Sequence, residues 1–387
     1  MKKLGLCVVI YNNNFGSMLQ SYATQKKLEN MGIEYEVIRY RKKYTPLFFI
    51  KSFFRIFNPI MLSEKKILIQ KKVNLSIHKD ISKYNALRNK KFDEFRKIYF
   101  QKLSPIYFGY SELLKAGKKY DAYLVGSDQL WSPSGLPSNF YNLKFVDDKI
   151  TKISYASSFG VKKIPFYQIK RTEEYLKRIE YIGVRENTGK NIVKELTGRD
   201  VQVVVDPTLL FNDKEWKSIL EYKSLYTEPY IFAYFLGPNE KHRMIVNQLK
   251  KSTGLKIVTI RHMDEYVDAD EKFGDYAPYN VGPVEFVSLI SHAQYICTDS
   301  FHGTVFSILH HKQFITFNRY SDNAIDSKNS RIDSLCSNLG LEDRRFKNNI
   351  EKEMLADIDY TSVDIKLEDM RKKSNSYLEK ALTCMGE

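Results

Sequence analysis

A histidine lies where a buried strand is predicted to turn into a helix. Residues 295–307 begin as an apolar run, break into small and polar residues, and become apolar again. This pattern predicts a strand, a sharp turn and a helix, with the turn at the carboxyl end of the strand, where ligands bind in open parallel sheets. A helix that begins near Gly303 and Thr304 would direct free N–H groups and its positive dipole end at an anion, with His302 beside it. Alternatively, Ser300 and the aspartate before it only cap the helix, and His302 packs in the core.

A second group of polar side chains follows another predicted strand. Residues 120–125 predict that strand, and Gly126 after it lets the backbone approach a ligand. Ser127, Asp128 and Gln129 then supply a hydroxyl, a carboxylate and an amide, a combination that can hold sugar hydroxyls. Alternatively, Asp128 caps a helix.

A third candidate site follows the first predicted strand, residues 4–10. Asn12, Asn13 and Asn14 come next, and a helix and a second strand over residues 34–40 complete a strand-loop-helix-strand unit of the Rossmann kind. The loop lacks the glycines of a dinucleotide fingerprint. The asparagines either hydrogen-bond sugar hydroxyls or form Asx turns.

Three arginines are candidates for binding an anion. Arg185 follows a short apolar strand, Arg261 ends another predicted strand, and Arg331 lies near the start of a predicted helix. Arginine suits carboxylates and phosphates because its guanidinium donates two parallel hydrogen bonds. Arg185 either binds an anion in a cleft or pairs structurally with Glu186 or Asp206.

The order of predicted elements indicates an α/β fold with two domains. At 387 residues the chain exceeds one ordinary core. Strands and helices alternate up to a proline turn at residues 206–208, and they alternate again after it. We therefore expect an N-terminal Rossmann-like domain over residues 1–205, a C-terminal Rossmann-like domain over residues 206–365 and a C-terminal helix over residues 366–387. The N-terminal domain would carry a basic and aromatic insertion, residues 43–100.

The net charge of +15 is concentrated in that insertion. Sixteen lysines and arginines but only four acidic residues lie between Lys42 and Lys102. Residues 46–58 combine Phe and Ile with two basic side chains, which is typical of a segment that lies in a membrane interface near anionic headgroups. The alternative is a packed helix followed by a solvated, lysine-rich helix over residues 65–97. Nucleic-acid binding is not expected, because no recognition motif accompanies the charge.

Cysteine usage and hydropathy narrow the class of protein further. The four cysteines are scattered and none forms a pair at metal-ligand spacing, so we expect reduced thiols and neither a disulfide framework nor a zinc site. The apolar start ends after seven residues at Tyr11, which predicts a strand instead of a signal peptide. No run reaches the roughly 18–20 apolar residues of a spanning helix. We expect a cytoplasmic protein, peripheral at the inner face of the membrane if the insertion binds lipid.

Six short motifs occur in order along the chain: Asn14–Gln20, Gly126–Trp131, Val184–Glu186, Asp206–Thr208, Gly282–Phe286 and Thr298–Gly303. Each is weak alone, but together they resemble the polysaccharide pyruvyl transferase family over about residues 4–345. The resemblance implies a glycosyltransferase-B-like fold, in which two Rossmann-like domains face each other across a cleft. It also implies transfer of a pyruvyl group from phosphoenolpyruvate to a sugar in surface-polysaccharide (capsule or exopolysaccharide) biosynthesis, usually as a ketal that bridges two hydroxyls.

The donor in that reaction carries a carboxylate and a phosphate, so at least two anion sites are needed. The candidate donor-binding residues are Arg185, Arg261, Ser300, Gly303, Thr304 and Arg331. Some family members have an arginine where this chain has Ser300, so Arg185, Arg261 or Arg331 would have to supply the missing charge.

The chemistry implied by the resemblance assigns further roles. His302 would protonate the methylene carbon of phosphoenolpyruvate, since a histidine titrates near working pH. Asp128 would orient or deprotonate the acceptor, a sugar or lipid-linked oligosaccharide, while Ser127, Gln129 and the asparagines at 12–14 contact its hydroxyls. No metal or other cofactor is required, because arginines can neutralise phosphate. The alternatives are a nucleotide-sugar-dependent glycosyltransferase of the same fold and a non-catalytic basic protein that binds membrane surfaces.

Overall fold

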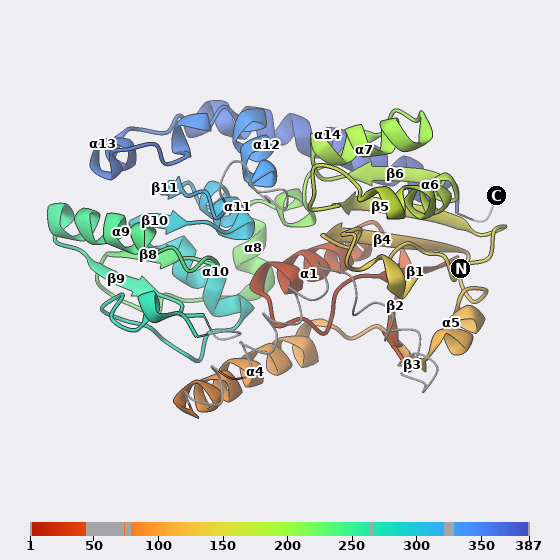
Figure 1. The fold of residues 1–387 in the computed structure, drawn as a ribbon, viewed down its shortest axis with the longest axis horizontal. Coiled ribbons are helices and arrows are strands. Elements are labelled where there is room, and N and C mark those ends of the chain that lie inside the picture. Colours follow the sequence, from red (N-terminus) through yellow and green to blue (C-terminus); the bar gives the residue numbers. More distant parts are fainter. Residues whose placement is uncertain (1, 44–72, 74–78, 263–265, 321–328, 386–387) are drawn as a thin grey trace.

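Two parallel sheets lie side by side in the computed structural model, which describes residues 2–43, 73, 79–262, 266–320 and 329–385 (Figure 1). The first sheet has the strand order β3-β2-β1-β4-β5-β6-β7. Its strands are β1 (Lys3–Cys7), β2 (Glu34–Arg41), β3 (Leu103–Phe108), β4 (Ala122–Asp128), β5 (Thr151–Ser157), β6 (Tyr181–Val184) and β7 (Gln202–Val203). The second sheet has the order β11-β10-β8-β9. Its strands are β8 (Tyr230–Tyr234), β9 (Lys256–Thr259), β10 (Tyr295–Thr298) and β11 (Gln313–Thr316). The predicted α/β class is confirmed.

Helices cover both faces of the first sheet, as the near-continuous apolar character of its central strands requires. α1 (Phe15–Asn30) packs on one face through Met18 and Leu19. The opposite face is covered by α5 (Tyr110–Ala116), α6 (Ile169–Lys177) and α7 (Asn187–Thr197). The helices of the second half are α8 (Asp213–Leu220), α9 (Glu240–Thr253), α10 (Pro283–His292), α11 (Phe301–Leu309), α12 (Ser330–Leu339) and α13 (Ile350–Leu355).

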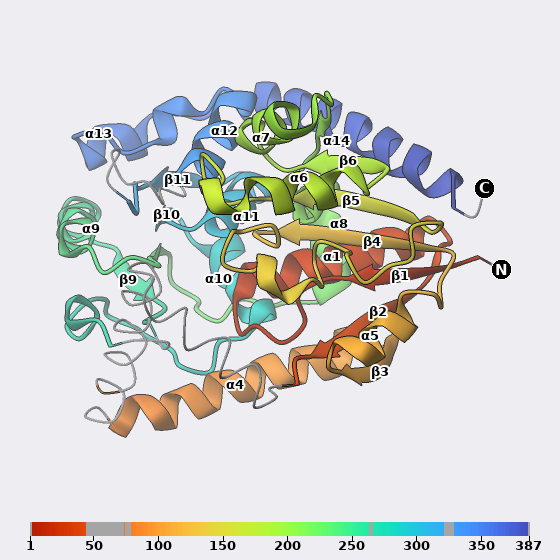
Figure 2. The same ribbon diagram turned by 45° about the vertical axis from the view of Figure 1, so that its right-hand side comes forward.

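Two long helices on opposite sides of the molecule tie the halves together (Figures 1 and 2). α4 (Lys79–Tyr99) buries Phe92 and Phe95 in the core and pairs Lys91 with Glu285 of α10 at 2.6 Å. α14 (Tyr360–Thr383) returns from the second half to the first sheet, where the hydroxyl of Tyr377 donates to the carbonyl of Ser154.

The structure describes only part of the basic insertion, so it tests only some of the predictions made for residues 43–100. Residues 46–58 lie outside the described residues. The lysine-rich helix expected over residues 65–97 is seen as α4 from Lys79 onward. Within the described parts of the chain, no helix combines the length and the apolar character that a membrane span needs. All four cysteines are free.

The strand order reverses once in each sheet. In the first sheet β1 lies between β2 and β4, and in the second β8 lies between β9 and β10. Adjacent strands whose connections leave to opposite sides open a crevice at their carboxyl ends, where ligands of α/β proteins bind. The fold therefore predicts a site beyond the ends of β1 and β4 and of β8 and β10.

Candidate functional site

A cavity of about 430 Å³ lies at that place, between the two sheets. Its walls come from the loops after β1, β4 and β8 and from the start of α11. We call it the cleft cavity. The lining residues include Asn12, Asn14, Gly16, Ser17, Asp128, Gln129, Ser300, Phe301, His302, Arg319 and Arg331. The fold thus brings together residues from all three groups of polar side chains that the sequence singled out.

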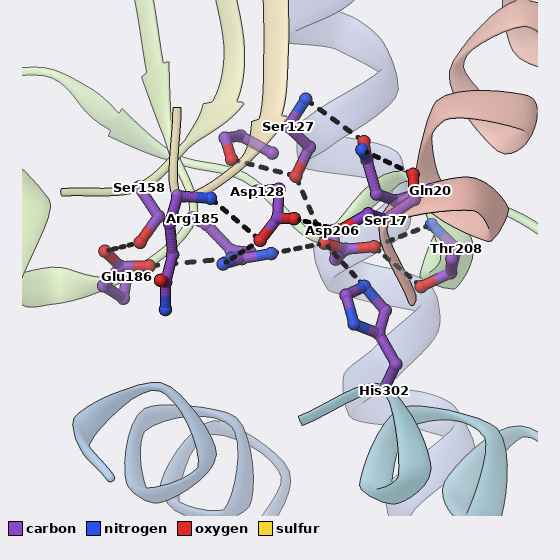
Figure 3. Close-up of polar contacts among 12 residues, drawn as sticks. Ser17, Gln20, Ser127, Asp128, Ser158, Arg185, Glu186, Asp206, Thr208 and His302 are labelled. Atoms are coloured by element: carbon purple, nitrogen blue, oxygen red, sulfur yellow. Dashed lines mark hydrogen bonds and ion pairs between the residues drawn. The ribbon is translucent and has the colours of Figure 1, made fainter. Parts of the chain in front are cut away.

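His302 occupies the first turn of α11 and is 7% exposed. Its Nε2 lies 3.7 Å from Oδ2 of Asp206, a contact between possible ion-pair partners that is drawn as a dashed line in Figure 3. At this distance Nε2 has no hydrogen-bond partner. Its Nδ1 edge lies against Gly16 of α1, where an added Cβ would fall 1.9 Å from Nδ1. A carboxylate beside Nε2 favours a proton on that nitrogen, so Nδ1 is left to exchange a proton with a ligand. Gly16 provides the room for the ring.

Asp206, which follows β7, is the centre of a buried polar cluster (Figure 3). Its Oδ2 accepts hydrogen bonds from Arg185 at 2.9 Å and from Ser127 at 3.1 Å, and its Oδ1 accepts two from Thr208. Burial alone would raise the pKa of this carboxyl. The nearby His302 and the charge and hydrogen bond of Arg185 outweigh that effect and hold the pKa of Asp206 far below its ordinary value. Asp206 is therefore ionised at neutral pH.

Arg185 forms ion pairs with Asp206 and Glu186, the second of the two roles that the sequence suggested for it. Besides Asp206, it lies within 3.8 Å of Asp128 and 3.7 Å of Glu186. Burial would lower the pKa of Arg185, but these three carboxylates raise it. Its guanidinium also lies 4.7 Å from the ring centre of Phe301. Because its charge is already compensated, Arg185 is a weak candidate for direct donor binding.

Asp128 ends β4 in a left-handed backbone conformation, with φ of 71°. The hydroxyl of Ser17 donates to its Oδ2 at 2.6 Å, which fixes the carboxylate at the cavity wall. Burial would raise its pKa, but Arg185, His302 and Ser17 hold the pKa of Asp128 below its ordinary value. A carboxylate of low pKa is a weak base but a good hydrogen-bond acceptor, so this geometry favours orienting the acceptor over deprotonating it.

Arg331, at the start of α12, is a cation on the cavity wall whose charge no described carboxylate neutralises. Within the described residues it makes neither an ion pair nor a hydrogen bond, and its guanidinium lies 5.6 Å from the ring centre of Phe301. Burial first, and then the charges of Arg185 and Arg319, lower the pKa of Arg331 to about 10. It still carries its charge at neutral pH, and an anion in the cavity would compensate that charge.

Arg319 is a second cation on the same wall. Its Nη2 donates to the carbonyl of Asp299 at 3.4 Å, and its Nε lies 3.8 Å from the carboxylate of the same residue. That carboxylate is already held by the backbone N–H groups of Leu236 and Gly237, at 2.6 and 2.9 Å. Arg319 was not recognised in the sequence, because it follows β11 without a distinctive motif.

The start of α11 is partly capped from within. The hydroxyl of Ser300 accepts from the N–H of Gly303 at 3.2 Å, and the carbonyl of Ser300 accepts from the N–H of Thr304. Gly303 and Thr304 do not line the cleft cavity, so their groups are already used inside the helix. No hydrogen bond from the N–H groups of Phe301 and His302 is found among the described residues, and both residues line the cavity. The positive end of the α11 dipole therefore lies at the cavity wall.

The predicted acceptor residues divide between the cavity and its surroundings. Asn12, Asn14 and Gln129 line the cavity, and the side chain of Asn14 also caps α1 by accepting from Ser17 N–H. Asn13 instead hydrogen-bonds Asn89 of α4. Ser127 is buried behind the cavity.

Arg261 lies elsewhere, beyond the end of β9. Its guanidinium donates to Tyr279 and to the carbonyl of Glu271, and it does not line the cleft cavity. Sequence reasoning missed the site residues Gly16, Ser17 and Arg319. For the first two a signal was present, because the Asn-Phe-Gly-Ser run follows a strand end as the other site loops do.

Together, two Rossmann-like sheets and a polar cavity between their carboxyl ends define an α/β fold of the glycosyltransferase-B type. Solved structures of that type align with nearly the whole chain. One is a UDP-N-acetylglucosamine 2-epimerase, with a TM-score of 0.53, 11% identity and coverage of 99% of this chain and 95% of the other. Another, assigned as the same enzyme from Listeria monocytogenes, has a TM-score of 0.51 and 10% identity, and the alignment covers 96% of this chain and 91% of the other. At such identities the likeness shows the fold alone, and it confirms the predicted class.

The family is shown by the sequence itself. The model of the polysaccharide pyruvyl transferase family matches residues 14–321. The chain belongs to this family of transferases, as its motifs predicted. No curated protein matches the chain.

Proposed function

We propose that the protein transfers a pyruvyl group from phosphoenolpyruvate to the hydroxyls of a sugar, forming a ketal in the biosynthesis of a surface polysaccharide. Membership of the family supports this proposal. The observation that carries it is Arg331, a cation on the cavity wall that makes no ion pair or hydrogen bond with the described residues. A buried cation of this kind is stabilised when an anionic ligand binds beside it.

The donor would lie against the wall formed by the second sheet. Arg331, Arg319 and the free N–H groups at the start of α11 are the groups on this wall that suit a phosphate and a carboxylate. Ser300 occupies the position where some relatives have an arginine, and Arg319 and Arg331 are placed to supply that missing charge. Neither Gly303 nor Thr304 is needed for this arrangement.

The reaction would begin with a proton transfer from His302 to the methylene carbon of phosphoenolpyruvate. C2 then becomes electrophilic, and an acceptor hydroxyl oriented by Asp128 attacks it and passes its proton to the now neutral His302. The C2–O bond to phosphate breaks with the electron pair leaving on phosphate, and a second hydroxyl closes the ketal ring and gives its proton to the departing phosphate. Asp206 would keep the Nε2 proton of His302 in place throughout. That the reaction needs no metal remains a prediction.

Calorimetric titration of the full chain with phosphoenolpyruvate tests the proposal. We expect binding in wild type and a loss of about 10–100-fold in Arg331→Ala, since a hydrogen bond to a charged group contributes about 1.5–3 kcal/mol. Arg261→Ala is the matched control, because Arg261 lies outside the cavity, and it should bind as wild type does.

A parallel titration with UDP-N-acetylglucosamine distinguishes pyruvyl transfer from the second candidate function, a nucleotide-sugar-dependent glycosyltransferase. Binding of the nucleotide sugar without phosphoenolpyruvate binding would overturn the proposal in favour of a glycosyltransferase. A further assay follows phosphate release from phosphoenolpyruvate in the presence of pooled sugar acceptors.

A further inference from the structure

We propose that residues 162–171, the basic-aromatic loop, dock the protein on an anionic membrane surface. This segment leads from β5 into α6 and includes the short 3₁₀ turn Phe166–Gln168. It is separate from residues 46–58, the membrane segment expected from the sequence. The inference concerns where the enzyme works and does not depend on which donor the cleft cavity binds.

The apolar side chains of the loop are unusually exposed. Phe166 is 86% exposed, more than any other large apolar residue in the described parts of the chain. Its neighbour Tyr167 is 51% exposed and Ile169 is 39% exposed. Leaving a phenylalanine almost fully in water forgoes the free energy that its burial would supply, and such residues mark surfaces that become covered.

The charge of the loop has one sign. It contains four basic residues and no acidic one: Lys162, Lys163, Lys170 and Arg171. All four are exposed, and none forms an ion pair within the described residues. The nearest acids along the chain, Glu173 and Glu174, are paired with Lys177 and Lys144. The free positive charge of the loop is therefore available to a partner.

One hydrogen bond joins the loop to the segment that follows β4, whose first residues line the cleft cavity. The side chain of Gln168 donates to the carbonyl of Pro133 at 3.1 Å. Gly160, two residues before the loop, packs against Gln129 of the cavity wall, where an added Cβ would lie 3.0 Å from Cδ of Gln129. A surface that contacts the loop would thus lie close to the cavity, which suits an acceptor that is carried in the membrane.

Exposed aromatic side chains flanked by basic residues without ion pairs favour a lipid surface over a protein as the partner of the loop. Aromatic rings partition into the boundary between headgroups and acyl chains, and lysines and arginines around them meet anionic headgroups. Each basic residue near such a surface strengthens binding by about fivefold. The loop therefore supplies both parts of a membrane anchor for a peripheral protein.

Co-sedimentation of the full chain with vesicles tests the proposal. We expect binding to vesicles of phosphatidylcholine with 30% phosphatidylglycerol (about one anionic lipid in three), little binding to phosphatidylcholine alone, and release by salt. Lys162→Gln with Lys163→Gln should weaken binding about 25-fold, and Phe166→Ser should weaken it as well. Lys241→Gln with Lys251→Gln, two exposed lysines of α9, is the charge-matched control and should bind as wild type does.

Fluorescence locates the contact independently. The two native tryptophans, Trp131 and Trp216, are buried. Phe166→Trp adds an exposed indole, whose emission should shift to the blue with anionic vesicles, whereas Ile365→Trp, at another exposed site on α14, should show no shift.

Absence of vesicle binding in wild type, binding that persists in the loop variants, or an unshifted Phe166→Trp emission would each overturn the inference. Phosphoenolpyruvate titration of the same variants separates the two proposals. Loop variants that lose vesicle binding but bind phosphoenolpyruvate as wild type does support the membrane contact. If wild type binds vesicles but not phosphoenolpyruvate, the membrane contact stands and the proposed function fails.

Discussion

The Nε2 atom of His302 lies 3.7 Å from the Oδ2 atom of Asp206, although the two residues belong to different sheets. Asp206 follows β7 at the end of the first sheet, and His302 follows β10 in the second. The same carboxylate is held by Arg185 and Ser127 of the first sheet. The orientation of the imidazole therefore depends on how the two halves of the molecule are placed against each other.

Replacing the histidine should separate binding from turnover. His302→Gln keeps a polar side chain of similar size beside Asp206 but cannot donate the proton. We expect phosphoenolpyruvate affinity close to that of wild type and turnover lower by about 10²–10⁴-fold, the range for a lost general acid. Calorimetry and phosphate release measure the two quantities, and unchanged turnover would reject the role.

Asp206 should act through His302. Asp206→Asn removes the charge beside Nε2, and we expect turnover to fall on the order of 10²-fold while donor affinity changes little. Nitrogen-15 NMR of the neutral His302 ring, the form left after the Nδ1 proton has been donated, should show the remaining proton on Nε2 in wild type and a weaker preference for Nε2 in the variant. Ser127→Ala, which removes a neutral hydrogen bond to the same oxygen, is the control. An unchanged tautomer in Asp206→Asn would show that the contact has no orienting role.

Gly16 should be needed for the position of the ring. Gly16→Ala places a methyl group where only 1.9 Å separates it from Nδ1, so His302 has to move. A displacement of about 1 Å at a reacting group can cost about 100-fold in rate. Gly135→Ala is the matched control, because the nearest atom to its Cβ would be 3.4 Å away. Equal kcat in both variants would contradict the arrangement.

The buried carboxylates should make stability depend on pH in acid. The pKa values of Asp128 and Asp206 are lowered in the folded chain. Their contribution to the free energy of unfolding is therefore complete above the unfolded pKa, about 4, and is lost as the pH falls below it. In urea unfolding, the stability difference between wild type and Asp206→Asn should narrow by about 1.4 kcal/mol per pH unit below pH 4. A difference that stays constant down to pH 3 would argue against a lowered pKa of Asp206 in the folded chain.

Much of the fold was readable from the chain because strands and helices depend on local patterns. The run around His302 predicted β10, a turn and α11, and the structure has them at Tyr295–Thr298 and Phe301–Leu309. The helix expected over residues 366–387 begins earlier, at Tyr360, and ends at Thr383. β3 was not anticipated, because it is a half-exposed strand whose Pro105 interrupts the pattern.

The sequence by itself determined the alternation of strands and helices, the polar residues at strand ends and the family, because each depends on residues close together in the chain. Only the tertiary structure decided which of those residues meet. It paired Arg185 with Asp206, left Arg331 without an ion pair or hydrogen bond among the described residues, brought His302 of the second half beside Asp206 of the first, and placed Arg261 outside the cavity. The physical reason is that these contacts join segments that are distant in the chain, so they depend on tertiary packing that no local pattern encodes.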